Sequence, residues 1–391
     1  MAHQILMLGG RRSGKSSILA SVLYSLRSNL ADSLCSVSDQ TNYSGSDSVG
    51  IPLHAKRIEI DNYLRTRQKV GANSNFLVDM TPTKGEGVYN LKIQIKGSKD
   101  VAFDFVDVPG EYMEAKSSNH SNLIEKVKNS DVYIIAIDTP YLMQDDNPNI
   151  NTVYNRTEEI TNLLANISIE NDNIDRKLII LCPVKCEKWT QSGKAEEVTD
   201  KVVEAYRNMI NNWVGSSAVD IWVMPIETAG GIVHSKLLDG YRVFKSDKDK
   251  TGELCSINPL TQQIMLKDGK TLLKKSVYNV EDEPDKSLYF DFTQLPLSWY
   301  MTNGKGFSPL YCEQPAYHIL RFLVKKEELA IKAEKDKIGK SPWWKRWWKK
   351  MWSPPFGKYL DAYHDLISEF EKQNQIKNQG DGFRKVDNLI K

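Results

Sequence analysis

Apolar and polar residues follow one another along the first half of the chain in the rhythm of an α/β protein. Continuous apolar runs at residues 5–8, 131–138 and 177–182 are typical of strands that are buried on both faces. Segments with apolar residues at helical spacing occupy residues 153–167 and 195–214. Because strands and helices alternate, the pattern predicts an α/β fold with a doubly wound, mostly parallel sheet.

Other segments complete this outline. Residues 88–95 and 101–106 have the pattern of strands and are separated by a Lys-Gly-Ser-Lys-Asp turn, which predicts an antiparallel hairpin. A strand is expected at residues 219–224 and a surface helix at residues 54–70. The Ser-, Asn- and Asp-rich stretch at about residues 27–48 predicts an exposed loop or flexible insert.

The rhythm changes in the second half of the chain. Residues 236–310 carry turn signals and short apolar stretches, which indicate an insertion with some β structure. Helical periodicity returns at residues 317–333, and we expect that helix to close the sheet. The predicted organisation is a domain over residues 1–335 with insertions at about 29–79 and 236–310, followed by a C-terminal helical appendage over residues 336–391.

Composition narrows the class of protein. The 391 residues are 40% hydrophobic, enough for a sizeable core, and no segment has the apolar length of a membrane span. The five scattered cysteines and the absence of a secretory pattern at the N-terminus predict a cytoplasmic location. A formal net charge of +2 gives no general affinity for nucleic acid, so no nucleic-acid partner is expected.

The first apolar run leads into a phosphate-binding motif. Gly9-Gly10-Arg11-Arg12-Ser13-Gly14-Lys15-Ser16 fits the pattern G-x-x-x-x-G-K-S, between a predicted strand and a predicted helix. Backbone N–H groups of such a loop and the positive end of the helix dipole surround a β-phosphate, while Lys15 adds a charge and Ser16 ligates Mg²⁺. The sequence therefore predicts a nucleoside triphosphate bound by Gly9, Arg12, Ser13, Gly14, Lys15, Ser16 and Ser17.

A second motif follows the hairpin. Asp107 ends an apolar strand in Asp107-Val108-Pro109-Gly110, where its carboxylate can hold Mg²⁺ through water opposite the phosphate loop. Gly110 would let a backbone N–H approach the γ-phosphate without an intervening side chain.

These motifs resemble those of GTPases of the translation-factor-related (TRAFAC) clade, with Asp107–Gly110 similar to its D-x-x-G switch II motif. The R-S-G-K-S loop, the V-D-V-P-G-E string and Cys312-Glu313-Gln314-Pro315 resemble the bacterial double-GTPase-like (DO-GTPase) proteins over roughly residues 1–335. The resemblance implies a Mg²⁺-dependent switch that binds and hydrolyses GTP.

The resemblance also implies a switch I hydroxyl on Mg²⁺. Thr83, in Thr81-Pro82-Thr83-Lys84-Gly85, is similar to the P-T-x-G form of that loop, and Thr81 is the second choice. The alternative is an ordinary Thr-Pro turn.

Base recognition departs from the usual N/T-K-x-D pattern. The chain has Val184-Lys185-Cys186-Glu187, where Lys185 would lie over the base and Glu187 would accept two hydrogen bonds from guanine. Thr228-Ala229 stands where GTPases have a short S-A-K-like loop beside the base. In the competing interpretation, Lys185 and Glu187 are a solvated pair on a loop.

Two residues are candidates for hydrolysis. Glu111 stands where many small GTPases have a Gln, so it either positions the attacking water or is a switch or structural residue. Arg11 stands where small GTPases have a glycine near the γ-phosphate, so it either acts as a built-in arginine finger or points to solvent.

Five of the nine tryptophans lie in Trp343–Trp352. As a helix this segment would present Trp and Met on one half and four Lys or Arg on the other, a pattern typical of helices lying at a lipid headgroup boundary. We expect this segment to bind an anionic membrane surface, so that the protein would associate peripherally with the inner face of the membrane. The alternatives are that it packs on the chain itself or binds in the groove of a protein partner. A second helix at residues 359–370 and a polar tail follow.

The competing class of function is a non-hydrolysing nucleotide-binding scaffold or adaptor. A kinase or ATP-driven motor is less favoured, because the sequence shows no set of residues that would bind a second substrate. A homo-oligomer is compatible with the clade, but no residue pattern requires it.

Overall fold

The structure is a computed structural model of the chain. It describes residues 2–30, 35–42, 52–70, 75–78, 85–95, 100–144, 148–167, 169, 175–213, 216–244, 253–257, 263–267, 271–272, 289–292, 296–339, 357–373 and 376–386.

An eight-stranded sheet forms the centre of the molecule, in the order β16-β8-β7-β6-β1-β5-β4-β2. β1 is parallel to both β5 and β6, and β6, β7 and β8 continue the parallel arrangement. β4 is antiparallel to β5, β2 to β4, and β16 to β8. The predicted mostly parallel sheet with an antiparallel hairpin is confirmed. Its strands are β1 (Ala2–Leu8), β2 (Cys35–Asp39), β4 (Gly87–Ile95), β5 (Val101–Asp107), β6 (Val132–Asp138), β7 (Lys177–Val184), β8 (Val219–Val223) and β16 (Arg384–Lys385).

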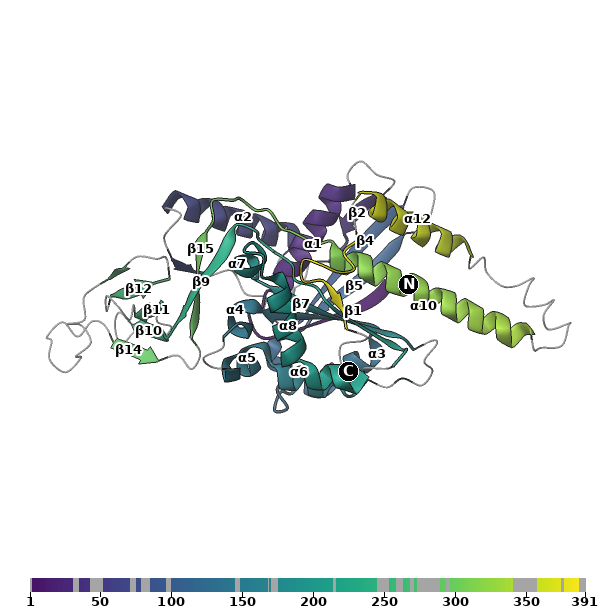
Figure 1. Cartoon of the computed structure of the whole chain (residues 1–391), viewed down its shortest axis with the longest axis horizontal. Coiled ribbons are helices and arrows are strands. Elements are labelled where there is room, and N and C mark those ends of the chain that lie inside the picture. Colours follow the sequence, from purple (N-terminus) through teal and green to yellow (C-terminus); the bar gives the residue numbers. More distant parts are fainter. Residues whose placement is uncertain are drawn as a thin grey trace.

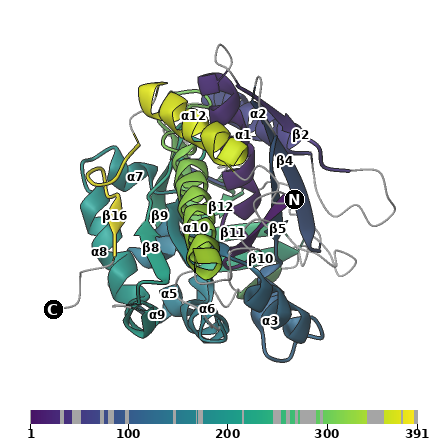
Figure 2. The same cartoon turned by 90° about the vertical axis from the view of Figure 1, so that its right-hand side faces the viewer.

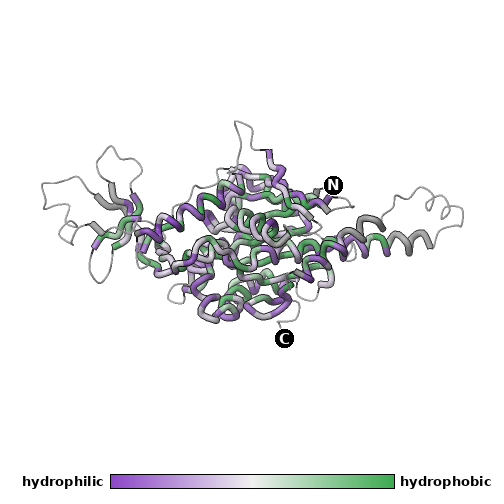
Figure 3. Tube along the Cα trace, turned by 90° about the horizontal axis from the view of Figure 1, so that it is seen from above, coloured by the Kyte–Doolittle hydropathy of each residue, from purple (hydrophilic) through white to green (hydrophobic). Residues whose placement is uncertain are grey.

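Helices cover both faces of this sheet, which explains the continuous apolar runs of its central strands. Along β1, Ile5 and Met7 face one core and Leu6 and Leu8 face the other. One core lies under α1 (Lys15–Leu30), α10 (Gln314–Gly339) and α12 (Gly357–Gln373). The other lies under α3 (His120–Asn129), α6 (Thr157–Leu164), α8 (Ala195–Ala205) and α9 (Arg207–Trp213). Figure 2 shows α10 and α12 crossing in front of the sheet, and Figure 3 shows that hydrophobic residues are concentrated along the strands of the central body.

Two segments predicted as single helices are each broken in two. Residues 153–167 contain the end of α5 (Pro148–Asn155) and α6, separated by Arg156, whose φ of 56° is left-handed. Arg156 is held there by ion pairs with Glu114 and Glu159. Residues 195–214 divide at the buried Tyr206 into α8 and α9. Apolar spacing continues across both breaks, so periodicity alone did not reveal them.

The expectation of a loop at residues 27–48 is wrong in part. α1 continues to Leu30, and β2 pairs with β4 at the edge of the sheet. An edge strand needs few apolar side chains, because only one of its faces and one of its backbone edges are covered. Among the side chains of β2 that the structure describes, Val37 is buried in the core.

The insertion near residues 236–310 contains β structure, as expected, arranged in two small sheets. A three-stranded sheet has the order β3-β15-β9, and a five-stranded sheet has the order β13-β12-β11-β10-β14. Their strands are β3 (Phe76–Leu77), β9 (Ile232–Leu238), β10 (Gly240–Phe244), β11 (Glu253–Ile257), β12 (Ile264–Leu266), β13 (Thr271–Leu272), β14 (Tyr289–Phe292) and β15 (Leu297–Thr302). β3 lies in the first predicted insertion, so the two insertions meet in one sheet. The five-stranded sheet and the far ends of α10 and α12 lie at opposite ends of the long axis (Figure 1).

The chain end returns to the main domain. The helix expected at residues 359–370 is present as α12, whose Leu366 and Phe370 are buried. The expected polar tail is instead partly a strand, because β16 pairs with β8 and buries Phe383 and Val386 on either side of it. So short a strand leaves no recognisable pattern in the sequence, and its contacts with distant segments stabilise it: pairing with β8 and ion pairs of Arg384 with Glu196 and Asp200 of α8.

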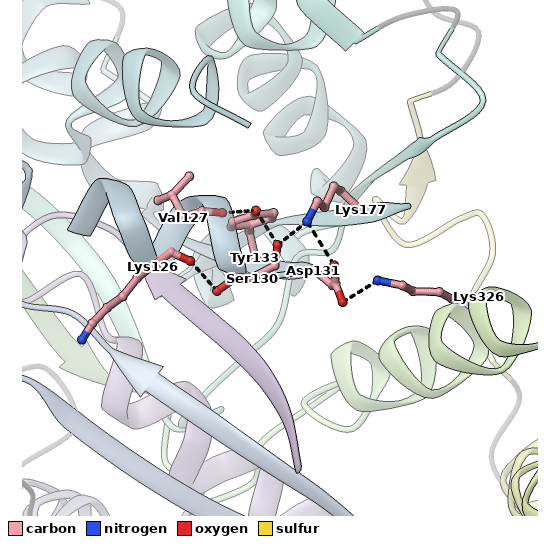
Figure 4. A network of polar contacts seen from close by, with 7 residues as sticks. All are labelled: Lys126, Val127, Ser130, Asp131, Tyr133, Lys177 and Lys326. Atoms are coloured by element: carbon pink, nitrogen blue, oxygen red, sulfur yellow. Dashed lines mark hydrogen bonds and ion pairs between the residues drawn. The ribbon is translucent and has the colours of Figure 1, made fainter. Parts of the chain in front are cut away.

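A polar network fastens α10 to the start of β6 (Figure 4). Asp131 forms ion pairs with Lys177 from β7 and Lys326 from α10. Burial opposes ionisation of Asp131, but these two cations lower the pKa of its carboxyl below the ordinary value. Lys177 also donates to the carbonyl of Ser130 at 2.8 Å, which links the end of α3 to the same cluster. Lys326 thus links α10 to the start of β6, in addition to the apolar residues that α10 buries in the core.

None of the helices in the part of the chain that the structure describes combines the length and the apolar character needed to span a membrane.

Candidate nucleotide-binding site

The phosphate loop follows β1 and ends where α1 begins at Lys15. Gly9 has a φ of 145°, and a Cβ there would lie 2.6 Å from the carbonyl oxygen of Ala136. A Cβ at Gly10 would lie 2.0 Å from the carbonyl oxygen of Tyr154. Neither position has room for a side chain, so the glycines let the loop lie against β6 and the end of α5.

Lys15 is directed back over this loop. Its Nζ donates to the carbonyl oxygens of Gly9 at 3.1 Å and Gly10 at 3.2 Å, and the residue is 8% exposed. Burial lowers the pKa of Lys15, while the negative charges of Asp107 and Glu111 act in the opposite direction. A bound polyphosphate would supply further negative charge and hold the ammonium form.

Asp107 meets α1 from the neighbouring strand. The hydroxyl of Ser16 donates to Oδ2 of Asp107 at 2.7 Å, and Nζ of Lys15 lies 4.0 Å from Oδ1. Burial raises the pKa of Asp107, opposed by Lys15 and by the hydrogen bond from Ser16. A hydroxyl and a carboxylate beside a phosphate loop are the hard oxygen ligands that Mg²⁺ takes. Ser16 and Asp107, both predicted as metal ligands, are therefore of the right chemical type to hold Mg²⁺.

The switch II segment lies against the phosphate loop. After Pro109, a short 3-10 helix η1 (Gly110–Met113) begins. A Cβ at Gly110 would lie 2.7 Å from the backbone nitrogen of Arg11. Glu111 and Arg11 are exposed side chains that line the same cavity. Gly110 therefore brings the two backbones into direct contact.

Lys185 lies on the other side of the loop, at the end of β7. It has a left-handed φ of 57°, and its Nζ donates to the carbonyl oxygen of Arg12 at 3.0 Å. The same Nζ pairs with Asp138 at the end of β6. Burial disfavours the charged amine, but the Asp138 carboxylate beside it raises the pKa of Lys185 above its ordinary value. The lysine is thus fixed as a cation beside the loop.

Glu187 occupies a different environment from Lys185. It is 2% exposed, and its Oε1 accepts the N–H groups of Ala229 at 3.4 Å and Gly230 at 3.3 Å. Burial raises the pKa of Glu187 to about 7. Glu187 is not a solvated loop residue, and among the described residues it is not part of the lining of the cavity.

A cavity of about 510 Å³ lies over the loop. The phosphate loop and α1 contribute residues 11–17, and β5 and switch II contribute Asp107, Pro109, Gly110 and Glu111. Further lining comes from β3, the residue after it and the second insertion, through Leu77, Val78, Leu254, Leu297, Ser298 and Tyr300. The two insertions therefore form part of this cavity.

Sequence reasoning did not find three features of the lining. Lys56, from α2 (Leu53–Val70), is 5% exposed. Tyr141, from α4 (Thr139–Leu142), stacks on Tyr154 with ring centroids 3.6 Å apart, and Tyr300 comes from β15. The available signal was weak: a lysine on the apolar stripe of a helix, and tyrosines in two short helices and one strand.

Most of the predicted phosphate and metal residues come together, namely Gly9, Arg11, Arg12, Ser13, Gly14, Lys15, Ser16, Ser17, Asp107, Gly110 and Glu111. Thr81 and Thr83 lie outside the described residues, as do the tryptophans of Trp343–Trp352.

A phosphate loop between β1 and α1, an acidic residue at the end of β5 and a mixed sheet with an antiparallel hairpin define a P-loop domain of the GTPase kind. The sequence model of the Double-GTPase 2 family (DO-GTPase2) matches residues 4–234. The chain belongs to this family and carries its GTP-binding domain.

Solved structures similar to the chain include two of the Ski7 GTPase-like domain of S. cerevisiae. The form bound to GDP and inorganic phosphate has 13% identity and a TM-score of 0.29, over 77% of this chain and 70% of that one. The form bound to GTP has 11% identity and a TM-score of 0.29, over 79% and 72% of the two chains. A search of curated proteins finds no match.

Proposed function

We propose that this protein is a Mg²⁺-dependent molecular switch that binds and hydrolyses GTP. The observation that carries the proposal is the contact between Ser16 and Asp107 beside the glycine-edged loop. A hydroxyl and a carboxylate beside Lys15 suit the binding of a nucleotide-bound cation, and membership of the Double-GTPase 2 family supports the same function.

The phosphate loop supplies binding and orientation. Its backbone N–H groups, at the N-terminus of α1, surround the β-phosphate, and Lys15 moves from the carbonyls of Gly9 and Gly10 to the phosphate oxygens. Ser16 and Asp107 would hold Mg²⁺, with Thr83 of switch I as a further hydroxyl ligand. The ion, when bound, neutralises charge that develops on the phosphates.

Glu111 and Arg11 are assigned to hydrolysis. Both are exposed and line the cavity on the side of Gly110, where the γ-phosphate would lie. Glu111 accepts a hydrogen bond from the attacking water and so orients it, and Arg11 stabilises the charge of the transition state. Gly110 brings its N–H toward the γ-phosphate, so that loss of this group releases switch II.

Guanine selection is assigned to Lys185 and Glu187. Lys185 already lies beside Arg12, along the loop. Glu187 would turn from the N–H groups of Ala229 and Gly230 to the guanine donors, and those two N–H groups would then be available to the base oxygen.

Calorimetric titration tests binding, with GTP, GDP and ATP in the presence and absence of Mg²⁺. We expect GTP and GDP to bind, ATP to bind more weakly, and Lys15→Ala to abolish binding. Equal affinity for ATP and GTP would refute the guanine assignment, and no heat with any of the three would refute the function.

Phosphate release under single-turnover conditions tests hydrolysis against the alternative of a scaffold. We expect release from GTP that needs Mg²⁺ and that falls in Glu111→Ala and Arg11→Ala. A protein that retains intact GTP would instead be a nucleotide-binding scaffold.

A membrane role for Trp343–Trp352 is supported by the position of the helices on either side. α10 and α12 extend away from the nucleotide site, toward the end of the long axis opposite to the five-stranded sheet (Figure 1). The segment between them carries tryptophans together with lysine and arginine, a composition suited to an anionic lipid surface. We expect co-sedimentation with vesicles containing anionic lipid, and loss of it when Lys345, Arg346, Lys349 and Lys350 are changed to Glu. Absence of binding at low salt would refute the membrane role.

A further inference from the structure

A third lysine lines the nucleotide cavity besides Lys15 and Lys185. Lys56 lies in the first turns of α2, is 5% exposed and is one of the residues that line the cavity. α2 belongs to the insertion that follows α1, and no motif placed Lys56 in the site.

Packing on both sides of Lys56 holds this part of α2 in place. Leu53 is fully buried in the core that α1 shares with the sheet. Ile60 and Leu64 are buried against β3, β9 and β15. These residues recur at helical spacing, so Lys56 occupies the buried face of α2, where its neighbours are apolar. A lysine in such a position is fixed near the cavity and is not free to extend into solvent.

The charges around the cavity favour a polyanion. Among the described lining residues, five carry a positive charge, namely Arg11, Arg12, Lys15, Lys56 and Lys185. Two lining residues, Asp107 and Glu111, are acidic. The anionic phosphates of a nucleotide are attracted to a lining in which basic residues outnumber acidic ones.

Lys56 has a carboxylate neighbour on the same helix. Nζ of Lys56 lies 2.9 Å from Oε2 of Glu59, three residues further along the helix. The side chain of Glu59 is 27% exposed, and Glu59 is not among the described residues that line the cavity. The lysine can therefore exchange or share this partner when an anion enters.

We propose that Lys56 contacts the phosphates of the bound nucleotide, as a second lysine that the insertion supplies in addition to the phosphate loop. The inference rests on the proposed function of the same cavity. It makes α2 a sensor of nucleotide occupancy, because the ligand then joins the insertion to the phosphate loop.

The test compares nucleotide affinities of the whole chain by calorimetry, with GTP, GDP and GMP and with Mg²⁺. Lys56→Gln removes the charge, and Lys56→Met removes it while suiting the apolar neighbours. We expect both to weaken GTP binding about 10- to 100-fold, the range for a hydrogen bond to a charged group. A loss with GTP alone assigns the contact to the γ-phosphate, and a loss with GDP as well assigns it to the β-phosphate.

Two further variants separate a ligand contact from a structural role. Lys69→Gln changes an exposed lysine in the last turn of the same helix, and it should bind nucleotide as the wild type does. Glu59→Gln removes the competing carboxylate, and it should bind at least as tightly as the wild type. If Glu59→Gln weakens binding as Lys56→Gln does, the pair acts structurally and the inference is refuted.

The inference and the function on which it rests fail in different ways. Unchanged affinity in both Lys56 variants, in a wild type that binds GTP and loses it with Lys15→Ala, would refute the inference alone. A wild type that binds no nucleotide would refute the function, and the inference with it.

Discussion

The carboxylate of Asp138, at the end of β6, forms a buried ion pair with Nζ of Lys185, which follows β7. The backbone of Asp138 is itself held by Asn155, whose Oδ1 accepts its N–H at 2.7 Å and whose Nδ2 donates to its carbonyl at 3.2 Å. Because Lys185 also donates to the carbonyl of Arg12, the pair connects two strand ends with the phosphate loop.

Asp138→Asn should therefore destabilise the protein. Breaking a buried ion pair leaves the remaining charge uncompensated, at a cost of about 3 kcal/mol. Lys185 is 23% exposed, so the lower part of the usual range is expected. Urea denaturation measures the change. Asp100→Asn is the matched control, because its pair with Lys92 is 33% and 36% exposed and should contribute less than about 1 kcal/mol. Equal stability of the two variants would contradict the role of Asp138.

Gly110→Ala should separate nucleotide binding from hydrolysis. The added Cβ would lie 2.7 Å from the backbone nitrogen of Arg11, so switch II must move away from the phosphate loop. Since small displacements of a reacting geometry cost about 100-fold in rate, we expect a loss of that order in GTP turnover and little change in GDP affinity.

Single-turnover phosphate release and GDP titration measure these two effects. Gly306→Ala is the control, because a Cβ there meets no atom within 4 Å. Unchanged turnover in Gly110→Ala would show that the close approach of the two backbones is unimportant.

Glu187 should make stability depend on pH. Its pKa is raised by burial from 4.5 to about 7, so the folded state binds a proton that the unfolded state releases at lower pH. Stability is therefore lost as the pH rises between these two values, by up to about 3 kcal/mol.

Glu187→Gln removes the titration but can still accept the N–H groups of Ala229 and Gly230 through its amide oxygen. We expect the variant to gain stability relative to the wild type as the pH rises from about 5 to about 8. Urea denaturation of both proteins at each pH measures this difference. A difference between the two proteins that is constant with pH would contradict the raised pKa.

Phe383→Ala should show that the chain end stabilises the main domain. Phe383 is 1% exposed, next to β16, in the core shared by α1, α10 and α12. Truncating a buried phenylalanine costs about 3 to 5 kcal/mol, measurable by urea denaturation. Val153→Ala, at a position that is 55% exposed, should change stability by less than about 0.5 kcal/mol. A similar small effect in Phe383→Ala would mean that β16 is a loosely attached end.

Local patterns predicted the part of the site that is local in sequence. The glycines from Gly9 to Gly14 lie within a few residues of Lys15 and Ser16, and their spacing alone specifies a loop before a helix. Asp107 was found because a strand ends there, and parallel neighbours bring their carboxyl ends to one edge of a sheet.

Other features depend on contacts between distant segments. Lys56 and Tyr300 reach the cavity from two insertions that meet through β3 and β15. The burial of Glu187 and its hydrogen bonds with the N–H groups of Ala229 and Gly230 join segments about forty residues apart. Since no periodicity records which distant residue a side chain will touch, these contacts could not be predicted.

The sequence by itself determined the α/β class, the phosphate loop and the position along the chain of the central strands, because repeated apolar spacing and glycine placement act over a few residues. Only the tertiary structure decided that β2 and β16 complete the sheet, that Arg156 and Tyr206 interrupt helices, and that both insertions form a wall of the cavity. Edge pairing, helix breaks and burial of lone charges are stabilised by partners far away in the chain, and their energies exist only once the fold has formed.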